Sequence, residues 1–195
     1  MAAMPDVVKI GGSAFGEPRR LRALLAGIAG RGAPLVVVAG GGALADAVRA
    51  VQPQLGLSDA AAHHMAILAM EQTALALADL EPRLAAFDSL AGLRAAHATG
   101  RASLWLPAAM ARRAPLPASW DVTSDSLALW LAIELGAARL TLVKSAQVSH
   151  PSGPPAVWLA QGLVDRYVPL LAPRFAGALR AVSLDAVLAE QEETA

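Results

Sequence analysis

The sequence DVVKIGGS, from Asp6 to Ser13, puts a lysine near the end of a β-branched run and follows it with two glycines. A run of this kind is typical of a buried strand. A lysine in such a strand needs a partner that compensates its charge, and glycines let the backbone approach a bound group closely. We therefore expect a central strand whose carboxyl end, beside Lys9, meets a phosphate. The alternative is an edge-strand lysine that points to solvent.

Strand and helix patterns alternate along the rest of the chain. Further strands are predicted at residues 33–39, 102–107 and 138–146, and a last strand and helix within residues 176–191. Helices are predicted at residues 17–29, 43–51, 58–80, 86–101 and 123–136, and an ordered loop at residues 107–120. Alternation of this kind implies right-handed crossovers and a parallel sheet covered on both faces. The fold class is α/β, and residues 1–195 are expected to form one domain.

Composition excludes several classes of protein. The 195 residues are 55% hydrophobic and carry sixteen basic and sixteen acidic side chains, so neither a nucleic acid nor an anionic membrane surface is an expected partner. Apolar segments are interrupted by polar residues before they reach about 18 residues, and the start of the chain does not resemble a secretory signal. Cysteine is absent. We expect a cytoplasmic globular protein.

Two predicted strands end in glycine clusters that suit phosphate. These clusters contain Gly11, Gly12 and Ser13 after the first strand, and Gly40, Gly41 and Gly42 after the second. Ligands bind beyond the carboxyl ends of parallel strands, and a helix amino terminus behind such a loop favours an anion. Neither cluster has the spacing of a dinucleotide fold or a P-loop. One such turn alone is usually only a tight connection, but two on successive strands favour phosphate binding.

A second lysine stands in the same relation to its own strand. Lys144 ends the apolar run LTLVK, so it and Lys9 can converge on one transferring phosphoryl group. Two buried ammonium groups repel each other, and a carboxylate between them is expected. Asp121 and Asp125 are four residues apart and share a helix face if the helix begins early enough. The alternative for both is capping of the helix start.

Other polar residues give weaker signals. Arg49, His64, Trp120 and Asp121 are candidate substrate contacts, although such side chains are more often solvated or structural. His63 and His64 are adjacent on a helix and point about 100° apart, which does not suit a shared metal. No protein-bound metal site is therefore predicted.

Together these motifs resemble the amino acid kinase superfamily, which includes the aspartate, acetylglutamate, glutamate and uridylate kinases. The resemblance is carried by VVKIGGS, LVVVAGGGALADAVR and TSDSLALWLAIELGAARLTLVKS, in that order. It implies a three-layer αβα sandwich with the acceptor bound by about residues 1–120 and ATP, with Mg²⁺, by about residues 121–195. It also implies that Lys9 and Lys144 stabilise the transferring phosphoryl group while Asp125 holds both lysines. A homodimer or higher homo-oligomer through residues 58–80 is implied as well.

The sequence differs from the common superfamily pattern in ways that point to one group of short members. The chain is short, and it lacks the DVDGV and DP signatures of the nucleotide region and the acceptor-binding arginine motif of acetylglutamate kinases. The stretches LSDAAAHHMAILAM and WDVTSDSLALWLA are similar to those of short kinases that phosphorylate an (aminomethylfuranyl)methyl phosphate in methanofuran-type cofactor biosynthesis, a part of one-carbon metabolism. The resemblance implies a phosphomonoester acceptor. The alternatives are a nucleotide- or oxoanion-storage protein and a carboxylate-accepting amino acid kinase.

Overall fold

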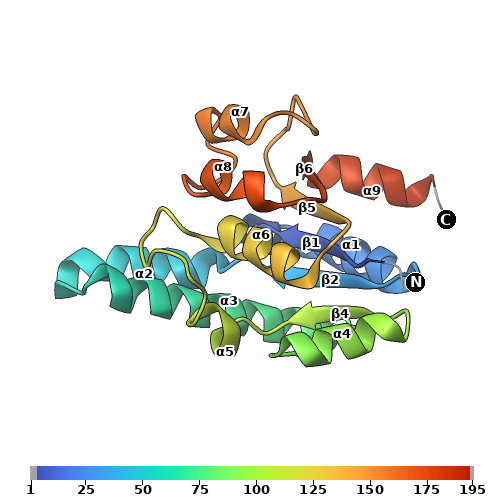
Figure 1. Cartoon of the computed structure of the whole chain (residues 1–195), viewed down its shortest axis with the longest axis horizontal. Coiled ribbons are helices and arrows are strands. Elements are labelled where there is room, and N and C mark those ends of the chain that lie inside the picture. Colours follow the sequence, from blue (N-terminus) through green and yellow to red (C-terminus); the bar gives the residue numbers. More distant parts are fainter. Residues whose placement is uncertain (1–3, 194–195) are drawn as a thin grey trace.

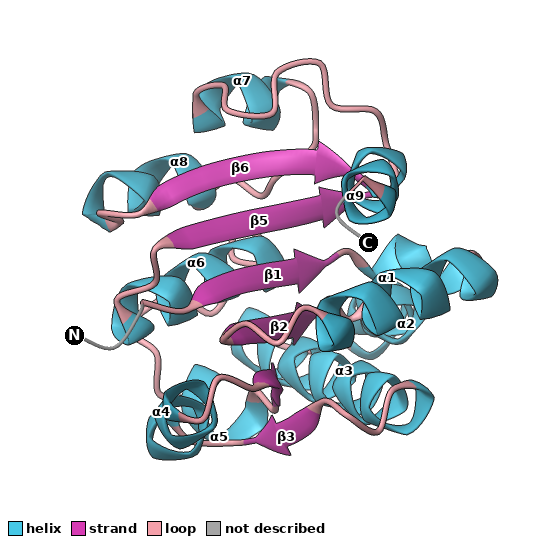
Figure 2. Ribbon diagram, turned by 90° about the vertical axis from the view of Figure 1, so that its right-hand side faces the viewer, coloured by secondary structure: helices cyan, strands magenta, loops and turns pink. Residues whose placement is uncertain are grey.

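The computed structural model describes residues 4–193, so the first three and last two residues of the predicted domain lie outside the description. One sheet of six parallel strands forms its centre (Figure 2), in the order β3-β4-β2-β1-β5-β6. The strands are β1 (Asp6–Ile10), β2 (Leu35–Ala39), β3 (Ala85–Phe87), β4 (Ala102–Trp105), β5 (Arg139–Lys144) and β6 (Ala178–Ser183). All pairings are parallel, which confirms the predicted α/β fold.

Helices cover both faces of this sheet (Figures 1 and 2). They are α1 (Pro18–Gly30), α2 (Gly42–Leu55), α3 (Asp59–Leu80), α4 (Leu90–Ala98), α5 (Ala108–Ala111), α6 (Ser124–Leu135), α7 (Pro155–Ala160), α8 (Val168–Leu171) and α9 (Leu184–Glu192). Helices α1 and α9 pack on one face with part of α3, and α4, α6 and α8 pack on the other. None of the helices within residues 4–193 combines the length and the apolarity that a membrane crossing requires.

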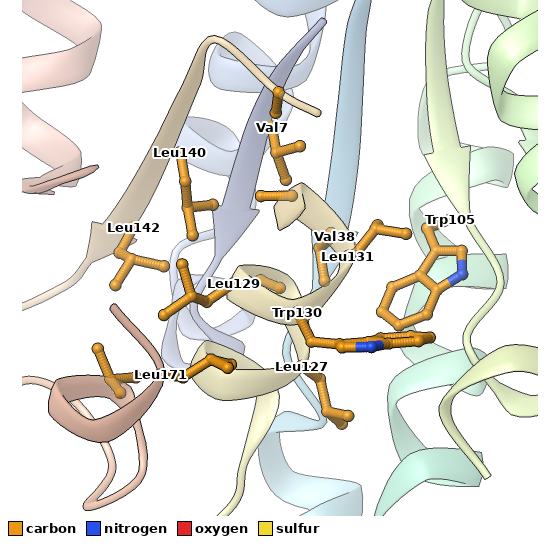
Figure 3. Packing of buried hydrophobic residues seen from close by; sticks show 14 of the residues in the cluster. Val7, Val38, Trp105, Leu127, Leu129, Trp130, Leu131, Leu140, Leu142 and Leu171 are labelled. Carbon is orange, nitrogen blue, oxygen red and sulfur yellow. The ribbon is translucent and has the colours of Figure 1, made fainter. Parts of the chain in front are cut away.

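Strand β1 lies in the middle of the sheet because its alternate residues face two separate cores. Val7 packs toward α6 and Val8 toward α1, and both are buried. Figure 3 shows the first of these cores, in which Leu129 of α6 lies toward Leu140 of β5, and Leu131 lies toward Val38 of β2. Helix α6 is buried at every position from residue 125 to residue 132. An apolar surface on all sides is what a helix enclosed between a sheet and other helices requires.

Two predicted segments differ from the structure. Residues 86–101 were expected to form one helix, but strand β3 occupies Ala85–Phe87 before α4 begins at Leu90. The sequence AAF has little strand character, so only pairing with β4 makes it a strand. The predicted loop at residues 107–120 contains one short helical turn, α5. The long predicted helix is confirmed: α3 begins after Ser58, whose hydroxyl accepts from the Ala61 N–H at 3.2 Å.

Candidate active site

One carboxylate lies between the two lysines. Lys9 Nζ is 2.9 Å from Asp125 Oδ1, and Lys144 Nζ is 2.7 Å from each Asp125 oxygen. Lys9 and Asp125 are 4% and 5% exposed, so the cluster is almost dry. Strands β1 and β5 are neighbours, and their parallel register brings Lys9 and Lys144 to the same end of the sheet. The expected carboxylate between two buried lysines is present, and it is Asp125.

The cluster shifts the acid–base equilibria of its members. Burial raises the pKa of Asp125, but the charges of Lys9 and Lys144 outweigh burial and lower this pKa to about 2. Burial, and then the charge of Lys9, lower the pKa of Lys144 to about 8, although Asp125 opposes both effects. At neutral pH the cluster thus holds two ammonium groups and one carboxylate. It carries a net positive charge in a place with little water.

Helix α6 positions Asp125 through its amino-terminal turn. The helix begins at Ser124, so Asp125 is in the first turn, where the helix dipole also favours a negative charge. Asp121 would share this helix face only if the helix began earlier, and the structure does not meet that condition. Asp121 lies three residues before the helix, is exposed, and is 3.7 Å from Arg166 in an ion pair. The helix starts later than expected because residues 121–123 form a turn and an extended N-cap.

The two glycine loops touch backbone to backbone above the cluster. A Cβ on Gly12 would lie 2.2 Å from the Gly42 nitrogen, and Gly42 has a φ of +52°. Only glycine fits such an approach. Gly11 and Gly40 donate their N–H groups to Val143 and Ile10 carbonyls and so extend the sheet ladder. These two glycines therefore support the loops, while Gly12, Ser13, Gly41 and Gly42 line a cavity.

This cavity has a volume of about 230 Å³ and opens between the glycine loops and the start of α6. Its wall beneath the loops is apolar, with Ile67, Met70, Val122 and Leu127. Its polar lining includes Asp46, Arg49, Thr123 and Ser124. Beside the cavity, Ser13 Oγ and Ser145 Oγ are 2.8 Å apart, so the loop after β1 meets the loop after β5. The cavity suits a small molecule with both an apolar and a charged part.

Two of the four candidate substrate contacts, Arg49 and Trp120, meet at this cavity in a way that the sequence does not specify. The Arg49 guanidinium lies 4.3 Å from the centre of the Trp120 ring, and Trp120 Nε1 donates to Gln52 Oε1 at 2.5 Å. His63 lines the cavity where His64 was predicted, and its Nδ1 donates to the Ser119 carbonyl at 3.2 Å. Burial lowers the pKa of His63, although the hydrogen bond to the Ser119 carbonyl opposes this shift.

The sequence did not predict that Asp165 belongs to this region, and the rarity of lysine, which marks the site, was not used in the prediction. Asp165 accepts hydrogen bonds from the start of α6, although it lies about forty residues further along the chain. No local pattern identifies it. The signal was the rarity of lysine: the chain has two lysines and fourteen arginines, and both lysines are in the cluster. Within residues 4–193, no group of three or more histidines, aspartates or glutamates is arranged to hold a metal ion.

Comparison with known proteins agrees with this geometry. Residues 4–147 match the amino acid kinase family. This chain belongs to the amino acid kinase family. Among curated relatives, the [5-(aminomethyl)furan-3-yl]methyl phosphate kinase of Methanocaldococcus jannaschii is 29% identical over 127 residues, which are 64% of this chain and 58% of that protein. The match thus spans less than two thirds of the relative's length.

Solved structures of the family share the fold. The uridylate kinase of Archaeoglobus fulgidus superposes with a TM-score of 0.72 at 14% identity, over 97% of this chain and 95% of the other. The UMP kinase of Ureaplasma parvum gives 0.69 at 16% identity, over 94% and 91% of the two chains. A Giardia lamblia carbamate kinase solved with AMP-PNP gives 0.54 at 12% identity, over 98% and 96%. At such identities these likenesses concern the fold alone.

Proposed function

We propose that this amino acid kinase family member transfers the γ-phosphoryl group of ATP to a small anionic acceptor, preferentially a phosphomonoester. The observation that carries the proposal is the buried Lys9–Asp125–Lys144 cluster below two touching glycine loops. Transfer of a phosphoryl group spreads negative charge over its oxygens, and fixed cations in a dry site stabilise that charge. Family membership and the furan-phosphate relative support the same reading.

In this mechanism the protein contributes positioning and charge. Lys9 and Lys144 would donate to the oxygens of the transferring group from two neighbouring strands, and Asp125 would keep both ammonium groups oriented. A phosphate acceptor is already an anion at neutral pH, so it needs no general base. Mg²⁺ would be held by the phosphates of the nucleotide and by water, as is common for this ion, because the described residues offer no acidic cage for it.

The cavity beside the glycine loops is the proposed acceptor site. An aminomethyl-furanyl phosphate has a flat ring, an anionic end and a cationic end. The apolar wall suits the ring, Arg49 suits a phosphate, and Asp46 suits an ammonium group. Asp46 and Arg49 are one turn apart on α2, with 3.3 Å between Oδ1 and Nη1, so they pair with each other without an acceptor. This acceptor, and with it a place in methanofuran-type cofactor synthesis, is part of the proposal.

The nucleotide is proposed to bind on the other side of the cluster, within about residues 121–195. The loop after β5 and α7 line a hollow of about 710 Å³ there, which includes His150, Pro151, Gly153 and Val157. Ser145 connects this region to the loop after β1. A cytoplasmic location stays a prediction from the sequence.

A homodimer through α3 is also proposed. Met65, Leu68 and Leu75 are 37%, 40% and 55% exposed, and their spacing puts them along one side of the helix. Exposed apolar side chains in a row mark association surfaces. Replacing Leu68 with glutamate should convert a dimer into a monomer in sedimentation velocity. A monomeric parent chain would contradict the dimer.

The central experiment measures ADP release from ATP with a panel of phosphomonoesters, amino acids and carboxylates. We expect turnover with a ring-bearing phosphomonoester and a loss of roughly 10²–10³-fold or more in the separate variants Lys9→Met and Lys144→Met. Arg101→Met, which removes an exposed cation before β4, is the matched control and should be fully active. Nucleotide binding without turnover of any acceptor would instead indicate a storage protein. Turnover of amino acids alone would indicate a carboxylate-accepting kinase.

A further inference from the structure

The half-buried carboxylate of Asp165 accepts six hydrogen bonds. Its Oδ2 accepts from the N–H and hydroxyl of Thr123, both at 2.8 Å, and from the Ser126 N–H at 3.1 Å. Its Oδ1 accepts from the Ser126 hydroxyl and from the N–H groups of Tyr167 and Val168, each at 3.1 Å. Four of the six donors belong to the two residues on either side of the Ser124–Asp125 pair.

These contacts replace a helix cap that the local sequence does not provide. Thr123 is the N-cap of α6, yet its side chain accepts no capping hydrogen bond. In a capping box, the N-cap and N3 residues satisfy each other's N–H groups with their own side chains. Here both N–H groups, of Thr123 and Ser126, are satisfied by one carboxylate from the segment between α7 and α8. The start of α6 is therefore fixed by a residue distant in sequence.

A second connection ties the same two segments together. The N–H of Tyr167 also donates to the carbonyl of Asp121 at 3.1 Å. The residues before α6 are therefore bound to the residues before α8 both by this backbone hydrogen bond and by the Asp165 carboxylate. Asp125, at the second position of α6, lies between the two clamped residues. Its carboxylate contacts both lysines at 2.7–2.9 Å, a geometry that a shift of about 1 Å would disrupt.

We propose that Asp165 is a positioning residue, which acts on phosphoryl transfer by holding the first turn of α6 so that Asp125 stays between Lys9 and Lys144. The kinetic part of this inference rests on the proposed function. Asp165 itself touches neither lysine and does not line the proposed acceptor cavity. The negative charge of Asp165 also raises the pKa of Lys144, which places the carboxylate within electrostatic reach of the cluster.

The test uses the scarcity of lysine. A protein labelled with [ε-¹³C]lysine has two side-chain signals, from Lys9 and Lys144, and each can be assigned with a Lys→Met variant. Asp165→Asn places an amide where two oxygens now accept N–H groups, so it should loosen the α6 turn and lower the pH at which the Lys144 signal titrates. Asp88→Asn, at an exposed aspartate beside the N-cap of α4, is the matched control. It should leave both titrations unchanged.

Steady-state kinetics give the second readout. In Asp165→Asn, kcat should fall by roughly 10–100-fold, the range typical when a group that orients an active-site residue is removed, with KM for ATP changed less than about twofold. If Asp165→Asn does not fold, Ser126→Ala removes one hydroxyl donor and should shift the Lys144 titration in the same direction by less. Identical lysine titrations in variant and parent, or a kcat that falls only with the folded fraction, would overturn the inference. If the parent chain turns over no acceptor, the proposed function fails, and the Lys144 titration in Ser126→Ala still decides the role of Asp165, because that variant removes a donor and keeps the charge of Asp165.

Discussion

Raising the pH from 7 to 10 should stabilise this fold and strongly lower its kcat/KM, because the Lys144 ammonium group affects the two in opposite directions. An ordinary lysine has a pKa near 10.5, and in the folded chain the pKa of Lys144 is about 8. The unfolded chain therefore binds this proton more tightly. Below pH 8 the charged Lys144 destabilises the fold in full, and as the pH rises from 8 to 10.5 that destabilisation disappears.

The size of the effect follows from the two pKa values. The difference between 10.5 and about 8 corresponds to roughly 3 kcal/mol, a substantial share of the stability of a typical domain. The alkaline range is unusually simple in this chain, because it has two lysines, one tyrosine and no cysteine. Few other groups lose a proton between pH 8 and 10.5, so a rise in the free energy of unfolding in this range can be assigned to Lys144.

The assay is urea unfolding followed by tryptophan fluorescence at several pH values, since Trp105, Trp130 and Trp158 are buried. The free energy of unfolding of the parent should rise by up to about 3 kcal/mol relative to Lys144→Met between pH 7.5 and 10. Comparing the change with pH, not the absolute stability, removes the constant effect of leaving one Asp125 oxygen without its lysine. Parallel stability curves for the two proteins would refute the reasoning.

In contrast to the stability of the fold, kcat/KM should decrease as the pH rises above 8. The ammonium form of Lys144 stabilises the transferring group, so kcat/KM should fall about tenfold per pH unit above pH 8. Bound ATP adds negative charge beside Lys144 and raises its pKa, so the same limb in kcat should lie at higher pH. A kcat/KM that stays constant to pH 9.5 would show that Lys144 is not needed as a cation.

Two further substitutions test the cavity. Gly12→Ala places a Cβ 2.2 Å from the backbone nitrogen of Gly42, so it should lower the free energy of unfolding by about 1–3 kcal/mol and reduce turnover sharply. Gly16→Ala, where nothing lies within 4 Å, is its control in both measurements and should be nearly silent. Trp120→Leu removes the stack on Arg49 and should raise KM for the acceptor while KM for ATP stays constant. If Trp120→Leu raises KM for ATP and leaves KM for the acceptor unchanged, the acceptor does not bind in this cavity.

The sequence predicts the strands nearest the site well, for a physical reason. Segments such as residues 35–39 and 140–143 are rich in aliphatic and β-branched residues and are bounded by glycine or polar residues, a pattern that suits a strand buried on both faces of a parallel sheet. Strand β3 lacks this character, and its three residues depend on the neighbouring strand. Local pattern cannot predict an element that exists because of its partner.

The same distinction separates the site residues. Lys9 and Lys144 are unusual in their local sequence, since each is a charge in an apolar run, and Asp125 stands just before another such run; the structure brings all three together. Asp121 stayed a second candidate beside Asp125 because the sequence does not fix the start of the helix to within three residues. Asp165 has an ordinary context, and its importance lies in donors that arrive from another segment. The choice between His63 and His64 likewise depends on the rotation of α3 in the packed fold.

Hydrogen-bonding capacity explains why this site uses lysine when the chain otherwise uses arginine. Two ammonium groups present about six N–H donors, whereas the two oxygens of Asp125 offer about four lone-pair sites. The cluster alone therefore leaves about two donors for an outside acceptor, which a phosphoryl group supplies. Two guanidinium groups would present about ten donors to the same carboxylate, and in a site this dry the excess would remain unsatisfied. Lysine thus leaves a small surplus of donors and charge, which one bound phosphoryl group can satisfy.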